Sequence, residues 1–302
     1  VYVSGQAWRF WWREALQKNV GWTLSPVIRD KNIAFTTADP LTYPDDDIFG
    51  YMRAATEEYE EKGKKKTRNI TVTRVSPLKN SALISVASVR PVSNWSSMAR
   101  HGDSVPYARQ EYSAIMKGMF SLDVDMVGTF SDYNRSGYKN ISETLKEKAI
   151  KEGASEIIDP FGTGKLVRLP LAVRQKRIVD TVLSLKNISG GAMQTNNMGD
   201  VTPKFIVLAS MNTGNHPFSH IAISRGERDE QALLNVTGLR EVLNEYKDNF
   251  IGKVFIGRRS GFFDDYDKEL KELADDYKDR IEYLPVNAAI DKFSEQLKFQ
   301  IR

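Results

Sequence analysis

The chain has 302 residues, of which 41% are hydrophobic and 27% charged, with a formal net charge of +4. This length and composition suffice for a substantial core, but the net charge alone is too small to indicate a nucleic-acid partner. The absence of cysteine excludes disulfides, thiolate zinc sites, iron–sulfur clusters and cysteine nucleophiles. The lack of cysteine fits a cytoplasmic protein, and no apolar run approaches a membrane span, so no membrane partner is expected.

The first predicted element is a helix over residues 4–18. Its apolar residues recur at helical spacing, and Ser4 is a suitable N-cap. Gln6, Arg9 and Arg13 fall on one polar ridge near the helix start, where free amide protons and the helix dipole favour an anion. The ridge predicts phosphate binding; the alternative is that both arginines extend from a tryptophan-rich face and pair with acids.

The middle of the chain reads as strands separated by insertions. Residues 21–68 lose the helical periodicity and are predicted to form an insertion, with a short helix at residues 48–61. The elements predicted next are strands at 70–75 and 82–86, a long loop at 89–106, a helix at 107–117, a strand at 120–126 and a helix at 141–152. Loops this long are uncommon in compact domains unless they bind something.

The second half alternates between strands and helices. A strand at residues 166–173 and a helix from residue 178 precede a second long loop at 187–202. From residue 204 onward, strands and helices alternate to the end of the sequence. With no repeat or clear linker, residues 1–302 are predicted to form one elaborated α+β domain.

No pattern of catalytic residues is convincing. His216 and His220 have the spacing of a helical metal pair, but Pro217 makes a helix doubtful there. Glycines at residues 162 and 164 precede Lys165 without the full spacing of a phosphate loop. We therefore expect no catalytic residue, no metal and no cofactor.

The basic residues give a stronger signal for binding. From residue 68 to 118 seven basic residues accompany two acidic ones, whereas acids outnumber bases fifteen to ten from 227 to 282. Basic residues interleaved with aromatic ones are typical of single-strand binding, although these charges could also be scattered over the surface. The candidate RNA-binding residues beyond the first helix are Arg74, Lys79, Arg100, Gly190, Gly191, Met193 and, as a weaker candidate, Arg258.

Several motifs, in order along the chain, resemble one known family. They are VSGQAWR at residues 3–9, WRE at 12–14, RVSPLK at 74–79, GTF at 128–130 and GGA at 190–192. Together they resemble the backbone subunits of CRISPR Cascade complexes, in the type I-B, DevR/Cst-like autoregulator branch. The resemblance extends from Val3 to about Ser210 and leaves the C-terminal third without a match.

That resemblance implies an RRM-like (ferredoxin-like) core with finger- and thumb-type insertions, the finger at residues 21–68 and one of the two long loops as the thumb. It also implies that the first strand of the core precedes residue 1. The implied function is non-catalytic, sequence-independent binding of the CRISPR RNA spacer by several copies arranged head to tail. The other implied partners are the target DNA strand, paired through the guide, and other Cascade subunits. In this chain, Ser4, Gln6, Arg9 and Arg13 would meet phosphates, with Arg74 and Lys79 on the palm.

Two other functions remain open at this stage. The alternating pattern from residue 204 onward could form a nucleotide-binding α/β enzyme, although no glycine fingerprint follows a strand there. A DNA-binding transcriptional autoregulator is the other alternative, although no helix-turn-helix pattern with a basic recognition helix is present.

Overall fold

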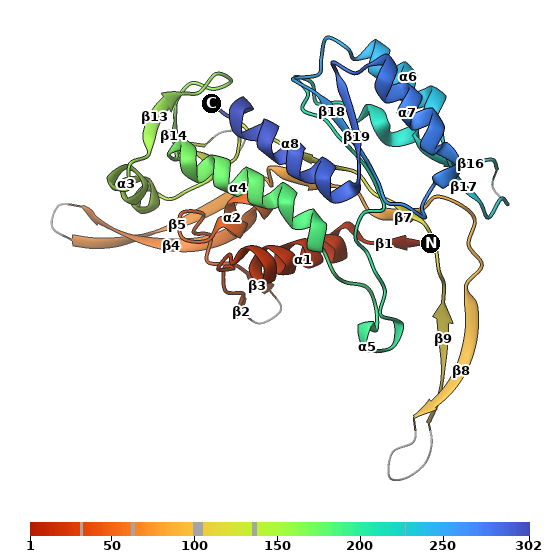
Figure 1. Cartoon of the computed structure of the whole chain (residues 1–302). Coiled ribbons are helices and arrows are strands. Elements are labelled where there is room, and N and C mark those ends of the chain that lie inside the picture. Colours follow the sequence, from red (N-terminus) through yellow and green to blue (C-terminus); the bar gives the residue numbers. More distant parts are fainter. Residues whose placement is uncertain (31–32, 62–63, 99–104, 135–137, 227) are drawn as a thin grey trace.

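The computed structural model describes residues 1–30, 33–61, 64–98, 105–134, 138–226 and 228–302 (Figure 1). The helices are α1 (Gly5–Ala15), α2 (Pro44–Phe49), α3 (Glu143–Lys151), α4 (Leu171–Leu183), α5 (Gln194–Asn197), α6 (Val236–Glu245), α7 (Asp267–Asp276) and α8 (Val286–Gln300). None of the described helices is long and apolar enough to span a bilayer.

The strands form small sheets and long hairpins. In the first two thirds of the chain they are β1 (Tyr2–Val3), β2 (Ile28–Asp30), β3 (Ile33–Phe35), β4 (Tyr51–Glu61), β5 (Lys64–Arg74), β6 (Leu78–Asn80), β7 (Leu83–Ser85), β8 (Val92–Met98), β9 (Val105–Glu111), β10 (Met116–Lys117), β11 (Phe120–Leu122), β12 (Thr129–Ser131), β13 (Ser155–Ile158) and β14 (Lys165–Arg168). The later strands are β15 (Phe205–Leu208), β16 (Ala222–Ser224), β17 (Ala232–Leu234), β18 (Val254–Arg258) and β19 (Ile281–Leu284).

Helix α1 forms where the sequence predicts it. The Ser4 hydroxyl accepts the Ala7 amide hydrogen at 3.2 Å, so the predicted N-cap is confirmed. The helix continues into one π turn (Leu16–Val20), and Gly21 then reverses the chain at φ 81°. This left-handed conformation is accessible to glycine without steric cost, which is why the helix ends there.

The sheet beside α1 is antiparallel, with β7 between β1 and β10. Strands β6 and β7 follow one another along the chain, as do β10 and β11, so the pair β6–β11 continues the pair β7–β10. Leu78 lies opposite Leu122 and Ile84 lies opposite Lys117, so six positions along the first strand correspond to five along the second. One extra residue in one strand of such a pair is a β-bulge, which bends the strands and increases their twist.

The insertion predicted at residues 21–68 is made of hairpins and one short helix. Strands β2 and β3 pair, α2 ends at Phe49, and β4 then pairs with β5 over eleven residues. The helix predicted at 48–61 is therefore wrong beyond Phe49, and the strand predicted at 70–75 is the second half of β5. The register sets Glu57 opposite Arg68 and Glu60 opposite Lys65, so strand pairing overrides the helix preference of these residues.

The long loop predicted at 89–106 and the helix predicted at 107–117 are both wrong. Residues in these ranges form the β8–β9 hairpin, in register from Val92 opposite Glu111 to Met98 opposite Val105. Figure 1 shows the hairpin projecting from the body of the molecule. Such a ribbon has no packed face, so its sequence lacks the apolar alternation that identifies a strand. The second predicted loop, 187–202, contains only the single turn of α5.

The C-terminal third forms a three-stranded sheet with helices around it. Strands β18 and β19 are parallel and are joined by α7, whereas β15 is antiparallel to β18. Helix α8 packs on this sheet and against α4 (Figure 1). Helices α6 and α7 pack around a second cluster of buried residues that includes Leu239, Ile256 and Leu270.

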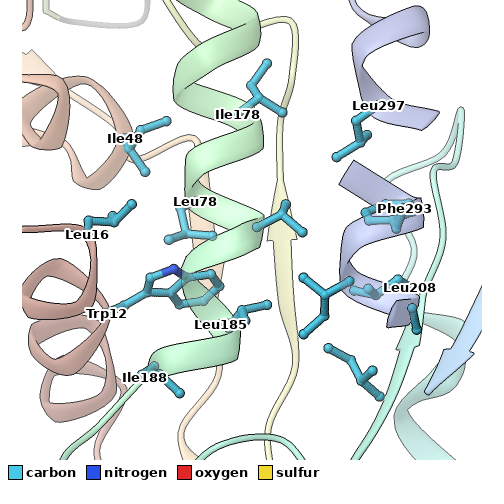
Figure 2. Close-up of a cluster of buried hydrophobic side chains, with 14 of the residues drawn as sticks. Trp12, Leu16, Ile48, Leu78, Ile178, Leu185, Ile188, Leu208, Phe293 and Leu297 are labelled. Atoms are coloured by element: carbon cyan, nitrogen blue, oxygen red, sulfur yellow. The ribbon is translucent and has the colours of Figure 1, made fainter. Parts of the chain in front are cut away.

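The main core contains side chains from the N-terminal helix α1 and from the C-terminal helix α8 (Figure 2). Trp12 and Leu16 of α1, Leu78 of β6, Ile178 of α4 and Phe293 of α8 belong to one buried cluster. The Trp12 indole N–H donates to the Thr181 carbonyl oxygen at 2.9 Å and to Ser184 Oγ at 2.8 Å, which satisfies its one polar atom. The predicted α+β class is confirmed; the RRM-like core stays a prediction.

Candidate nucleic-acid interface

Arg74, predicted to lie on an RNA-binding palm, is buried instead. Its side chain is 0% exposed and stacks on Phe130, with the guanidinium carbon 4.3 Å from the ring centroid. It forms an ion pair with Asp47 and donates to the carbonyl oxygens of Thr129 and Met126 at 3.0 and 2.7 Å. Arg74 therefore stabilises the fold and is not available to a phosphate.

Asp47 is the centre of this buried ionic cluster. Besides Arg74, its carboxylate accepts hydrogen bonds from Arg177 Nη1 at 2.7 Å and from the Gly128 amide at 2.9 Å. Two side chains from different elements, β5 and α4, thus meet on one residue of α2. The sequence suggests only a turn or cap at residues 45–47, because the two arginine partners lie 27 and 130 positions away.

The two arginines of the α1 ridge, Arg9 and Arg13, also bind other residues of the protein. Arg9 donates to the carbonyl oxygens of Leu78 and Phe49 at 2.7 and 2.8 Å, and to Asn80 Oδ1 and Ser76 Oγ, both at 2.9 Å. Desolvation, followed by repulsion from Arg13, lowers the pKa of Arg9. Arg9 is therefore an anchor between α1 and β6, and its contact with phosphate stays a prediction.

Arg13 and Gln6 retain more freedom than Arg9. Arg13 forms an ion pair with Asp45 but stays one quarter exposed, and its buried Nε has no hydrogen-bond partner among the described residues. Gln6 is exposed, and its side chain makes no hydrogen bond within the described part of the chain. Of the predicted ridge, Gln6 and part of Arg13 remain open to a ligand, while Ser4 Oγ is used as the cap.

The predicted RNA-binding residue Arg258 adds no free charge. Arg258 is only 8% exposed and is held by Asp264, Asp267 and the Tyr283 hydroxyl. These acidic and hydroxyl partners raise its pKa despite desolvation. Arg258 is thus an internal residue of the C-terminal sheet and is not available to RNA. Arg100 lies outside the described residues.

Lys79 is the predicted cation that the structure leaves free. It is exposed and, within the described residues, makes no ion pair or side-chain hydrogen bond. Its neighbours Leu78 and Asn80 face α1, since Leu78 lies in the core and the Asn80 amide donates to the Gly5 carbonyl oxygen at 3.1 Å. Because side chains alternate along a strand, Lys79 points to the opposite side of the sheet.

That opposite side carries an exposed apolar and aromatic surface. Tyr2 pairs with Ile84 across β1 and β7, and they are 71% and 54% exposed. Ser121 pairs with Lys79 across β11 and β6. We call these four residues the open sheet face: Tyr2, Lys79, Ile84 and Ser121. Of these four residues, only Lys79 was predicted from the sequence.

The loop at residues 187–202 is fixed to α1 at its start. A Cβ added to Gly190 would lie 2.2 Å from Trp11 Cγ, so only glycine allows the backbone to lie this close to the indole ring. Gly191 has φ 111°, which also favours glycine. Met193 and Met198 flank α5 with positive φ values of 54° and 46°. Non-glycine residues in this conformation are strained, a feature that clusters at binding sites.

We expect Gly190→Ala to detach this loop from α1 without unfolding the protein. The added methyl group must displace either Trp11 or the backbone, and such overpacking costs about 1–3 kcal/mol. Amide hydrogen exchange of residues 191–202 should become faster. Gly199→Ala is the matched control, because its Cβ would lie 3.7 Å from Gln194 Nε2, an ordinary contact. Equal exchange in both variants would contradict this role of Gly190.

The residues considered as a phosphate loop or a metal pair lie in turns. Gly162 and Gly164 lie against Tyr133, where a Cβ on Gly164 would be 2.6 Å from Cε1, and the segment leads into β14 instead of a helix. Pro217 begins a 3-10 turn that contains His220. No group of three or more potential metal ligands occurs among the described residues.

The C-terminal sheet departs from the nucleotide-binding pattern considered above. Such a site uses a helix N-terminus after a parallel strand to hold phosphate. Here the chain after β18 carries Asp264 and Asp267 at that position, and both carboxylates bind Arg258. In comparisons with known proteins, no family model and no curated protein matches the chain.

Proposed function

We propose that this chain binds single-stranded RNA without sequence preference, as a non-catalytic, multi-copy subunit of a type I-B Cascade complex. The observation that carries the proposal is the open sheet face, where an exposed tyrosine and an exposed isoleucine lie on the paired strands β1 and β7, and a lysine unpaired within the described residues lies on β6, the strand before β7 in the chain. Sheet surfaces of this composition bind single strands by stacking bases on the aromatic ring and attracting the phosphates.

The arrangement around this face supports the same interpretation. We interpret β1, the β6–β7 and β10–β11 strands, α1 and α4 as the RRM-like core, and the β4–β5 hairpin as the finger-type insertion. The β8–β9 hairpin and the loop at 187–202 are the two candidates for the thumb. Trp95, which is 79% exposed on β8, adds a second aromatic surface on a projecting element.

The proposal includes its partners. The chain would hold the spacer of a CRISPR RNA in the cytoplasm, next to further copies of itself and other Cascade subunits, so that the guide pairs with a target DNA strand. Since spacer sequences differ, contacts to phosphate and sugar with base-tolerant stacking suit this task better than contacts to base edges.

The test compares two unrelated single-stranded RNAs with duplex DNA of equal length by fluorescence anisotropy. We expect Tyr2→Ser with Lys79→Glu to weaken the binding of both RNAs about tenfold or more, because one stacked base contributes ~1–3 kcal/mol. The salt dependence should also fall by roughly 0.7 in logarithmic slope for each phosphate that the variant no longer binds. The control is Lys278→Glu, which reverses an exposed charge, unpaired within the described residues, far along the chain.

Three results would contradict the proposal. RNA affinity unchanged by the double substitution would remove the open sheet face as the site. Tighter binding of duplex DNA than of RNA at matched salt would favour a transcriptional regulator. Thermal stabilisation by a nucleotide and not by RNA would favour an α/β enzyme.

A further inference from the structure

A small cavity opens between the C-terminal ends of α6 and α7. Its apolar lining comes from Leu243 of α6, Phe250, Val254 of β18 and Tyr277, the residue that ends α7, and its volume is about 140 Å³. A cavity of about 150 Å³ holds one benzene molecule, whereas sites for cofactors and other whole ligands measure roughly 300–1,000 Å³. The cavity therefore suits a single aromatic side chain.

Two cations, Lys247 and Arg280, also line this cavity. Both are exposed, and neither makes an ion pair or side-chain hydrogen bond in the part of the chain that the structure describes. Several basic residues nearby are paired, Arg240 with Asp276 and Lys253 and Lys292 with Glu282, whereas Lys278, like the two cavity cations, has no ion pair within the described residues.

The positions of these cations relative to the neighbouring helices explain only part of their presence. Lys247 lies two residues after the end of α6, close enough for a positive charge to interact favourably with the helix dipole, whereas Arg280 lies four residues after the end of α7. That interaction contributes only about 0.3–1 kcal/mol at an exposed position and leaves the charges accessible to a ligand. A cavity lined by apolar side chains and by these two cations is complementary to an apolar group flanked by carboxylates.

We propose that this cavity is a docking site for an acidic segment of a partner protein, with one aromatic side chain in the cavity. The flanking carboxylates of that segment would pair with Lys247 and Arg280. Interfaces commonly place a buried aromatic anchor at their centre and charged pairs around it. The cavity lies in the C-terminal third of the chain and shares no residue with the open sheet face, so this inference does not depend on RNA binding.

The test uses three capped tripeptides: Glu-Phe-Glu, Glu-Ala-Glu and Lys-Phe-Lys. Their binding to the full chain is followed by the methyl NMR signals of Leu243 and Val254. We expect Glu-Phe-Glu to shift these signals at the lowest concentration, because it alone supplies both the ring and the carboxylates. Lys247→Glu with Arg280→Glu should raise the half-saturating concentration about tenfold, since two favourable pairs become repulsive.

The matched control is Lys278→Glu, which reverses an exposed charge next to Tyr277 that does not line the cavity. We expect it to bind Glu-Phe-Glu as the unchanged protein does. Equal binding of Lys-Phe-Lys would refute the role of the cations, and equal binding of Glu-Ala-Glu would refute the aromatic anchor. Absence of any shift with Glu-Phe-Glu would refute the site itself.

Discussion

Replacing Asp47 by asparagine is expected to lower the free energy of unfolding by about 3–5 kcal/mol, the usual cost of breaking a buried ion pair from one side. The carboxylate is 0% exposed and bonded to both Arg74 and Arg177, which would remain buried next to a neutral amide. Urea denaturation monitored by tryptophan fluorescence would measure this decrease. A decrease below about 1 kcal/mol, the range of an exposed pair, would show that the cluster is not tightly buried.

Asp46→Asn is the matched control for this experiment. Asp46 is also buried, but it accepts hydrogen bonds from the Asp39 amide and the Thr37 hydroxyl and forms no ion pair among the described residues. Burial is the largest cause of its shifted pKa and raises it. The charged form is thus disfavoured in the folded protein, so a neutral side chain should cost far less here than at position 47.

Arg9→Met is the second substitution with a large expected effect, about 3 kcal/mol or more of unfolding free energy. It removes four hydrogen bonds, including the Arg9 donor to the Phe49 carbonyl oxygen, whereas the Leu78 carbonyl oxygen still accepts from the Ser76 hydroxyl; a bond to a charged group contributes about 1.5–3 kcal/mol. The same denaturation experiment would measure it.

Comparing Lys79→Met with Arg9→Met distinguishes a cation that binds RNA from one that stabilises the fold. Because Lys79 is exposed and unpaired among the described residues, its substitution should change stability by no more than about 0.5 kcal/mol. RNA affinity should nevertheless fall in this variant. If Arg9→Met were as stable as Lys79→Met, the internal role of Arg9 would be refuted.

The sequence was most informative where structure is local. Helix α1 follows from its own apolar spacing and from Ser4, and both signals lie within a single segment. The roles of Arg9 and Arg74 could not be read in this way. An arginine that binds phosphate and one that binds a buried carboxylate look the same in sequence, and Asp47 becomes a neighbour of Arg74 only through the fold.

The hairpins were missed for a different reason. Strand β8 is rich in serine and asparagine and projects into solvent, so no core selects alternate apolar residues along it. Strand β4 has a glutamate-rich sequence with helical preference, and only its pairing with the lysine-rich β5 makes it extended. The open sheet face lacked a signal because its strands are two or three residues long, shorter than a reliable pattern.

The shared core also determines when this polypeptide can fold during synthesis. Trp12 near the start and Phe293 and Leu297 in the last helix belong to one buried cluster. A nascent chain that has emerged only as far as α4 would still expose α1 and β6 surfaces that belong to the same core as α8. We therefore expect this main core to be completed only after translation has reached the end of α8, and until then chaperones that hold apolar segments would have their greatest effect.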